Sequence, residues 1–446
     1  MRDLHSVGLG TAALALLVAC GSSGGGGGGP SDGGGSSASS GSSGASGSGA
    51  GSGSGGGSGS GGSSGSIGGS SGSGGSGSSS GSGGSSSGSD ACASSSIDVT
   101  VMDATGRYPI PNVAVYIASG ALPVVAHGPG SCPSVPTSGG ALTGLNGIAS
   151  VPVGTGNVQV VAQLGKWRST VNVAACDATP VKINLASSTS AGAPAFAVTT
   201  GKSDTLECTM HRLGLDDAVT YFQGAGGVEP TGAEASSSLL GSESTLAAFD
   251  AVILSCEGAA TANASSVALS SYVTAGGILY AEHWGYSVLD AAPFTSENLA
   301  TWNTGSSFLT GTTSATFVTS TAAGLDFQSW LQMRGALSSN ELPLMNAEVA
   351  SNVATLGTAS TLWISADSSA SVPNSPLLFS WSSGGGGLVV YADYHVADAV
   401  GDYGTTPGSV SVTSGSYPSG CSVETTLTPP ELAFMYTLYE QLSCGM

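Results

Sequence analysis

The chain has 446 residues, of which only 8% are charged, and its formal net charge is −20. Its eight Lys and Arg residues form no cluster, and binding to nucleic-acid phosphates requires one, which excludes nucleic acid as a partner. The acidic residues are spread along the chain, a pattern that indicates solubility rather than a binding site.

The N-terminus has the features of an export signal. The apolar run Val7–Ala19 is too short to span a membrane and has the length of a signal-peptide core. Leu17-Val18-Ala19-Cys20 resembles the lipobox of bacterial lipoproteins, in which the cysteine is acylated and becomes the mature N-terminus. The resemblance implies that residues 1–19 are a signal peptide and that Cys20 carries lipid. An ordinary secretory signal with an incidental cysteine is the alternative.

A tether follows the predicted lipid site. Residues 20–90 are almost entirely Gly and Ser after Cys20, cannot bury apolar surface, and are predicted to be disordered. A flexible tether of about 70 residues spans about 45 Å. With Gly21 after the cysteine, the resemblance implies an exported protein at the outer membrane or cell surface, held there through its lipid anchor.

Residues 91–188 alternate apolar and polar side chains, as half-buried strands do. Turn residues separate the runs, and the spacing predicts a small β-sandwich. The predicted strands are Ile97–Val101, Val113–Ile117, Val158–Ala162, Thr170–Val173 and Val181–Leu185. The segment also contains the motifs Val101-x-Asp103-x-x-Gly106, Ile110-Pro111-Asn112-Val113-x-Val115 and Thr143-x-x-x-Gly147-x-Ala149. With these motifs it resembles the carboxypeptidase regulatory-like, transthyretin-like domain, and the resemblance implies an accessory module without peptidase activity.

In residues 189–446 the spacing of apolar residues changes, and strand-like runs alternate with helical patterns. The short apolar runs Ala251–Leu254 and Ile278–Ala281, with a helical pattern between them, are typical of parallel strands buried on both faces. We therefore predict a flavodoxin-like α/β domain with a mainly parallel sheet. Further predicted strands are Phe196–Thr199, Thr361–Ile364, Leu377–Trp381 and Leu388–Tyr391.

Helix starts are marked by capping sequences. Asp204 and Glu207 have the spacing of a capping box, as do Thr428 and Glu431, which also enclose two first-turn prolines. The second signal predicts a C-terminal helix that begins after Thr428.

Polar residues follow three of the predicted strands. They are Ser255-Cys256-Glu257-Gly258, His283, and Asp393-Tyr394-His395. Their layout resembles the class I glutamine amidotransferase-like fold, in which the first position is the oxyanion loop, the second the nucleophilic cysteine, and the third the catalytic histidine and acid. Imidazole does not replace a thiolate in making a thioester, so glutaminase activity is not expected.

The same strand ends carry the candidate site residues. His283, His395 and Asp393 are candidates for acid–base catalysis, and His283, His395 and Glu282 are candidate metal ligands. Glu257 is a candidate supporting carboxylate. The alternative is a pair of histidines hydrogen-bonded to their own loops. No cofactor is predicted.

The cysteines of an exported chain are expected to form disulfides. Seven remain besides Cys20, so one thiol is left over. We predict the pairs Cys421–Cys444 and Cys208–Cys256, although Cys256 as a nucleophile is the alternative. Cys132–Cys176 is a third pairing, which leaves Cys92 free.

Two functions stay open at this point. The first is a membrane-anchored cell-envelope lipoprotein with a non-catalytic binding or structural role toward an envelope or extracellular ligand. The second is a hydrolase or metal-binding enzyme that uses a His/Asp cleft at the strand ends.

Overall fold

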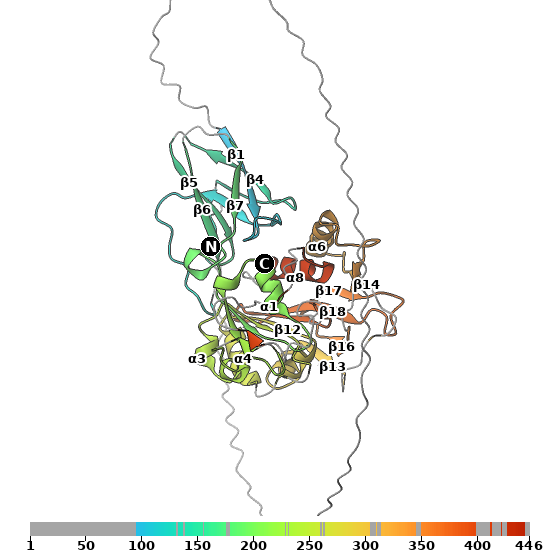
Figure 1. Ribbon diagram of the computed structural model, residues 1–446. Coiled ribbons are helices and arrows are strands. Elements are labelled where there is room, and N and C mark those ends of the chain that lie inside the picture. The colour runs from blue at the N-terminus through green and yellow to red at the C-terminus, as the bar shows by residue number, and fades with distance from the viewer. Residues whose placement is uncertain are drawn as a thin grey trace, which may run out of the picture. The chain divides into compact units, whose positions relative to one another are not determined.

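The structure is a computed structural model (Figure 1). It describes residues 95–441 except 131–132, 137–138, 155, 175–178, 228, 231, 259–260, 262–263, 304–308, 310–313, 345–348, 398–410, 413–420 and 422–425. All of these belong to the second of the two units into which the chain divides, Ser86–Met446. The predicted signal peptide, Cys20 and the tether lie outside the described residues, and the predicted boundaries at 90 and 188 stay predictions.

Seven strands between residues 95 and 184 form two sheets that share one apolar core. The sheet of order β4-β1-β7 consists of β1 (Ser95–Met102), β4 (Ile148–Val153) and β7 (Val181–Asn184). The sheet of order β3-β2-β5-β6 consists of β2 (Ala114–Ile117), β3 (Gly140–Leu142), β5 (Val158–Leu164) and β6 (Trp167–Val173). Five of these strands coincide with predicted apolar runs. Alternate residues of β4 are buried, which is the pattern of a strand with one face on a core.

A nine-stranded mixed sheet occupies the rest of the described chain, in the order β15-β14-β17-β18-β19-β12-β11-β8-β9. Its strands are β8 (Phe196–Thr199), β9 (Val219–Phe222), β11 (Ala251–Leu254), β12 (Ile278–Glu282), β14 (Ser314–Phe317), β15 (Leu342–Pro343), β17 (Ser360–Ala366), β18 (Pro376–Ser382) and β19 (Leu388–Ala392). Neighbours from β19 to β9 are parallel, whereas those from β15 to β19 are antiparallel.

The antiparallel half corrects the prediction of a mainly parallel sheet. β17, β18 and β19 follow one another through loops 367–375 and 383–387, which are too short for the crossover of about a dozen or more residues that joins parallel neighbours. All three strands are present where the sequence predicts them, so the error concerns their direction.

Helices cover both faces of this sheet (Figure 1). Residues alternate along each strand, so Ala251 and Ile253 face one core while Val252 and Leu254 face the other. The first core includes α1 (Leu206–Arg212), α6 (Ala322–Met333) and α8 (Pro429–Glu440). The second includes α2 (Ser236–Leu240), α3 (Glu243–Leu246), α4 (Ser266–Thr274) and α5 (Tyr286–Leu289).

Short elements complete the described chain. They are the 3-10 turns η1 (Thr189–Ala191), η2 (Asp216–Ala218), η3 (His283–Gly285) and η4 (Phe294–Glu297), and the paired strands β10 (Glu229–Pro230) with β20 (Ser411–Val412) and β13 (Ala300–Trp302) with β16 (Val353–Leu356). Among the helices that the structure describes, none has the length and apolar character to cross a membrane.

The two capping predictions have different outcomes. α8 begins at Pro429 with a complete capping box between Thr428 and Glu431, as predicted. α1 begins at Leu206 without a side-chain cap, so the predicted Asp204 cap is wrong. The Asp204 carboxylate instead accepts hydrogen bonds from backbone N–H groups more than 190 residues later in the chain.

The two-sheet part and the nine-stranded sheet share buried contacts. Trp167, at the start of β6, is fully buried and packs on Phe196 of β8 and on Tyr439 of α8. Beside it, the Lys166 ammonium lies 2.7 Å from the Asp250 carboxylate, and both side chains are at most 9% exposed. One apolar cluster therefore runs through both parts of Ser86–Met446.

A disulfide joins Cys208 of α1 to Cys421, which shows that both predicted pairings of these cysteines are wrong. α1 lies against the start of α8, because Thr209 and Arg212 both contact the Glu431 carboxylate. Cys421, which precedes α8 in the sequence, is thus within reach of Cys208. Cys256 is a free, buried thiol. Cys92, Cys132, Cys176 and Cys444 lie outside the described residues.

Removing this disulfide should destabilise the protein by about 2–4 kcal/mol, because the bond closes a long loop in the unfolded chain. Its two cysteines are 213 residues apart in the sequence. Urea unfolding of Cys208→Ala, Cys421→Ala and the double variant measures the effect. The three variants should lose equal stability, since each breaks the same bond, and additive losses in the double variant would contradict the pairing.

Candidate metal centre

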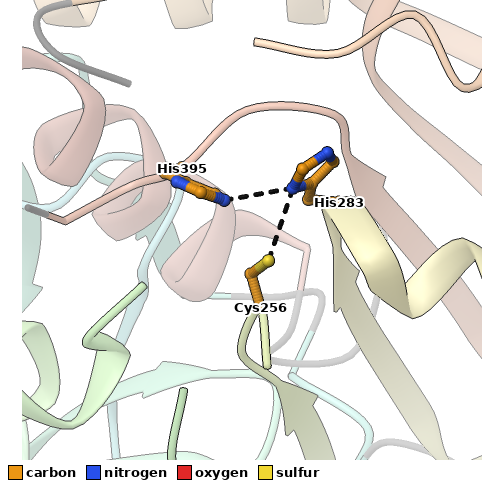
Figure 2. Close-up of side chains that lie close together, drawn as sticks. All are labelled: Cys256, His283 and His395. Carbon is orange, nitrogen blue, oxygen red and sulfur yellow. Dashed lines mark hydrogen bonds between the residues drawn. The ribbon is translucent and has the colours of Figure 1, made fainter. Parts of the chain in front are cut away.

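Three neighbouring strands of the sheet end at one place (Figure 2). β11, β12 and β19 are mutually parallel neighbours, so their carboxyl ends share one sheet edge. Cys256 follows β11, His283 follows β12 and His395 follows β19. The three side chains point toward one another in Figure 2.

The donor atoms of these residues converge on a small space. Cys256 Sγ lies 3.3 Å from His283 Nδ1, which in turn lies 3.1 Å from His395 Nε2. One donor atom from each residue lies within 4.8 Å of the other two. Ligand atoms around a tetrahedral zinc ion are separated by roughly 3.3–3.6 Å, given bond lengths of about 2.0–2.3 Å. The side chains of Cys256 and His283 are fully buried and that of His395 is 4% exposed.

Burial keeps all three groups neutral. It raises the pKa of the Cys256 thiol to about 12, although the backbone N–H groups of Gly258 and Trp284 act in the opposite direction. Burial also lowers the pKa of His283 to about 4. The pKa of His395 falls to about 3, because of burial and the neighbouring His283. Near neutral pH the imidazoles therefore keep the lone pairs that a metal ion needs.

These residue types form a soft donor set. Imidazole nitrogen and thiolate sulfur are ligands for Zn²⁺ and related transition metals, whereas Ca²⁺ and Mg²⁺ prefer oxygen. A bound cation deprotonates a coordinating thiol. The N–H groups of Gly258 and Trp284 that point at Cys256 would also stabilise its thiolate.

The backbone of His283 is held in an unusual conformation. Its φ is +36°, in the left-handed region that favours glycine. The Tyr391 hydroxyl donates to the His283 carbonyl at 2.8 Å, and the Asn352 amide lies 3.4 Å from the same oxygen. This conformation directs the imidazole toward Cys256, and Tyr391 and Asn352 fix it.

Asp393, a predicted catalytic residue, lies outside the group of convergent donors. Its carboxylate accepts hydrogen bonds from the Asn352 backbone and side chain, each at 2.7 Å. It also lies 2.8 Å from the Tyr391 hydroxyl, whose single proton it shares with the His283 carbonyl. Burial raises the pKa of Asp393 to about 7, and these hydrogen bonds oppose that shift. Asp393 therefore orients the residues that hold His283.

Glu282, a predicted metal ligand, also lies outside the group of donors. Side chains alternate along β12, so Glu282 faces the same side as Tyr280, whose hydroxyl donates to it at 3.3 Å. Its carboxyl is hydrogen-bonded to Asp204 and to the backbone N–H of Cys256. Burial, followed by the Asp204 charge, raises the pKa of Glu282 well above its usual range.

The Asp204–Glu282 pair supports both sides of the centre. Glu282 contacts the backbone of Cys256, and Asp204 accepts N–H bonds from Val396 at 2.5 Å and Ala397 at 2.9 Å, directly after His395. Glu257, predicted as a supporting carboxylate, contacts Ala225 and Ser236 instead. The pair therefore ties the Cys256 loop to the His395 loop.

Cys256 is the ligand candidate that sequence reasoning missed, because the oxidising compartment favoured a disulfide at this position. The available signal was that three adjacent predicted strands are each followed within four residues by Cys or His. A disulfide would have removed the thiol, and the structure assigns the Cys208 sulfur to Cys421.

Neither a protein-family model nor a curated protein matches this chain. Among solved structures, the mmIFT52 N-terminal domain is similar with a TM-score of 0.30 and 14% sequence identity, over 45% of this chain and 85% of that one. The cytoplasmic protein STM3548 from Salmonella typhimurium is similar with a TM-score of 0.29 and 11% identity, over 46% of this chain and 89% of that one. Likenesses at these scores carry no functional argument.

Proposed function

We propose that this chain is a lipid-anchored cell-envelope protein that binds a transition-metal ion, in the simplest case Zn²⁺, through Cys256, His283 and His395. The convergence of three buried soft donors within 4.8 Å carries this proposal. Three protein ligands leave a fourth tetrahedral position for water or another ligand. The lipobox at Cys20 and the Gly/Ser tether support the anchored location.

The proposal includes the family resemblances read from the sequence. We assign residues 91–188 to the carboxypeptidase regulatory-like, transthyretin-like sandwich and residues 189–446 to the class I glutamine amidotransferase-like fold. The parallel strands β8, β11, β12 and β19, with helices on both faces, support the second assignment. His283 then occupies the place of that family's nucleophile, in a left-handed conformation.

A hydrolase is the second candidate, because the Cys256–His283 distance of 3.3 Å suits a nucleophile and its base. Two observations favour the metal site instead. The thiol is fully buried, which leaves a substrate no access to it, and burial raises its pKa to about 12. A single ion requires far less space than a substrate and supplies the charge that ionises the thiol.

Cobalt(II) titration of the purified protein tests the metal site. Cobalt bound by a thiolate and imidazoles absorbs visible light and shows a sulfur-to-metal charge-transfer band. We expect saturation at one cobalt per chain, displacement by zinc, and loss of the charge-transfer band in Cys256→Ser. Cobalt binding with an undiminished charge-transfer band in that variant would contradict the assignment of Cys256, and no binding to the wild type would contradict the site.

Lipid attachment is tested separately. Cys20→Ala should move the protein from the membrane fraction to the soluble fraction, because the thiol that the lipid modifies is lost. Cell fractionation followed by immunoblotting measures this, with Ser22→Ala as a control that leaves the cysteine intact. Membrane retention of Cys20→Ala at the wild-type level would refute lipid anchoring at this residue.

A further inference from the structure

A cavity of about 690 Å³ lies beside α6 and α8, away from the metal centre. Leu388, the first residue of β19, lines this cavity, whereas His395 follows the last residue of the same strand. The two sites therefore lie at opposite ends of β19. The cavity volume falls in the range of small-molecule pockets, which is roughly 300–1,000 Å³.

The wall of this cavity is acidic. Asp326 of α6 and Glu440 of α8 line it, and none of the described residues that line it is Lys or Arg. Glu440 is only 6% exposed, and its Oε2 accepts a hydrogen bond from the Asn112 amide at 2.8 Å. Its Oε1 has no hydrogen-bond partner within the described part of the chain.

A second buried polar group in the wall also lacks a partner. Gln441 is 6% exposed, and neither its side-chain oxygen nor its nitrogen has a hydrogen-bond partner among the residues that the structure describes. An unpaired buried polar atom costs about 1–3 kcal/mol, so adjacent unpaired atoms at a cavity indicate a missing ligand.

Two aromatic rings complete the wall. Tyr436 is stacked on Phe327 with ring centroids 4.4 Å apart, and the Trp363 indole N–H donates to the Ser380 hydroxyl at 2.9 Å. Both rings are thus held in place. Aromatic faces carry negative charge density and attract ammonium groups.

We propose that this cavity binds a small organic cation, a primary amine, whose ammonium group lies between Asp326 and Glu440 and also donates to the Gln441 side-chain oxygen. An ammonium group donates three hydrogen bonds and accepts none, which fits two of the unpaired atoms of the wall, Glu440 Oε1 and the Gln441 side-chain oxygen. Burial raises the pKa of Glu440 to about 7, and the Asp326 charge adds to this shift although the Asn112 hydrogen bond opposes it. A bound cation offsets the cost of ionising that buried carboxyl.

Calorimetric titration of the purified protein at pH 8 with 1,4-butanediamine and with 1,4-butanediol tests this proposal. The two probes have nearly the same shape and differ in charge. We expect the diamine to bind at least 100-fold more tightly than the diol. Glu440→Gln should weaken diamine binding at least tenfold, and Asp326→Asn, at a half-buried position, should weaken it by a similar factor.

Glu297→Gln, at an exposed position outside the cavity, is the matched control and should bind the diamine as the wild type does. Urea unfolding establishes whether each variant is folded. The proposal would be overturned if the diol bound as tightly as the diamine, or if folded wild-type protein bound no diamine. It would also be overturned if calcium ions displaced the diamine with an affinity equal to that of the diamine itself. Since the probes are not metals, these outcomes are independent of the zinc site.

Discussion

Zinc should stabilise the wild-type protein against thermal unfolding and should leave the double variant Cys256→Ser/His395→Ala unaffected. An ion that binds only the folded state stabilises it by about 2.7 kcal/mol when its free concentration is 100 times its Kd. The double variant retains only His283 of the three donors. It therefore loses chelation, which for structural zinc sites is worth on the order of 10 kcal/mol of binding free energy.

Scanning calorimetry with and without zinc, each against a chelator-treated sample, measures this effect. His211→Ala is the matched control, because that imidazole is 46% exposed and contacts Asp216 outside the donor group. It should keep the full zinc-dependent shift. A double variant that is folded in the chelator and still shows the wild-type shift would show that zinc binds elsewhere. The chelator-treated samples also measure how much stability the substitutions cost by leaving a cavity. That cost can then be distinguished from the loss of stabilisation by the metal.

Breaking the buried ion pair between Lys166 and Asp250 should cost about 3–5 kcal/mol of unfolding free energy. Asp250 Oδ1 lies 2.7 Å from the Lys166 ammonium, and Oδ2 accepts from the Ala195 backbone at 2.7 Å and lies 2.9 Å from His127 Nδ1. The Lys166 ammonium also donates to the Gly128 carbonyl. Lys166→Met leaves the Asp250 carboxylate buried without its main counter-charge.

Urea unfolding of Lys166→Met measures this cost. Asp216→Asn, which breaks the exposed His211–Asp216 pair, is the control and should change stability by no more than about 1 kcal/mol. A loss below 1 kcal/mol in Lys166→Met would mean that water or another group replaces the ammonium. Because Lys166 and Asp250 come from the two halves of the described chain, the experiment also measures how strongly those halves support each other.

The central strands of the nine-stranded sheet were predictable because their burial on both faces leaves a clear pattern in the sequence. Ala251–Leu254 and Ile278–Ala281 are unbroken apolar runs, and a strand buried on both faces requires such a run. Their parallel pairing then implied that Cys256, His283 and His395 meet at one edge. β13, β14 and β16 escaped prediction, because their short sequences rich in Ala and Thr carry no clear period.

The cysteine pairing could not be predicted, because it depends on which helices lie together. Cys208 meets Cys421 only because Arg212 and Thr209 of α1 contact Glu431 at the start of α8. A contact over more than two hundred residues leaves no local pattern in the sequence. The direction of the Glu282 side chain was predictable from the alternation along its strand.

The order of α8 after the sheet has a consequence for biosynthesis. Pro429–Glu440 follow every strand of the nine-stranded sheet, yet they cover its centre, where Phe434 packs on Tyr280 with ring centroids 5.1 Å apart. A nascent chain that has completed β19 thus exposes this apolar face until α8 leaves the ribosome. During that interval the face is open to aggregation and to chaperones, although all nine strands are present.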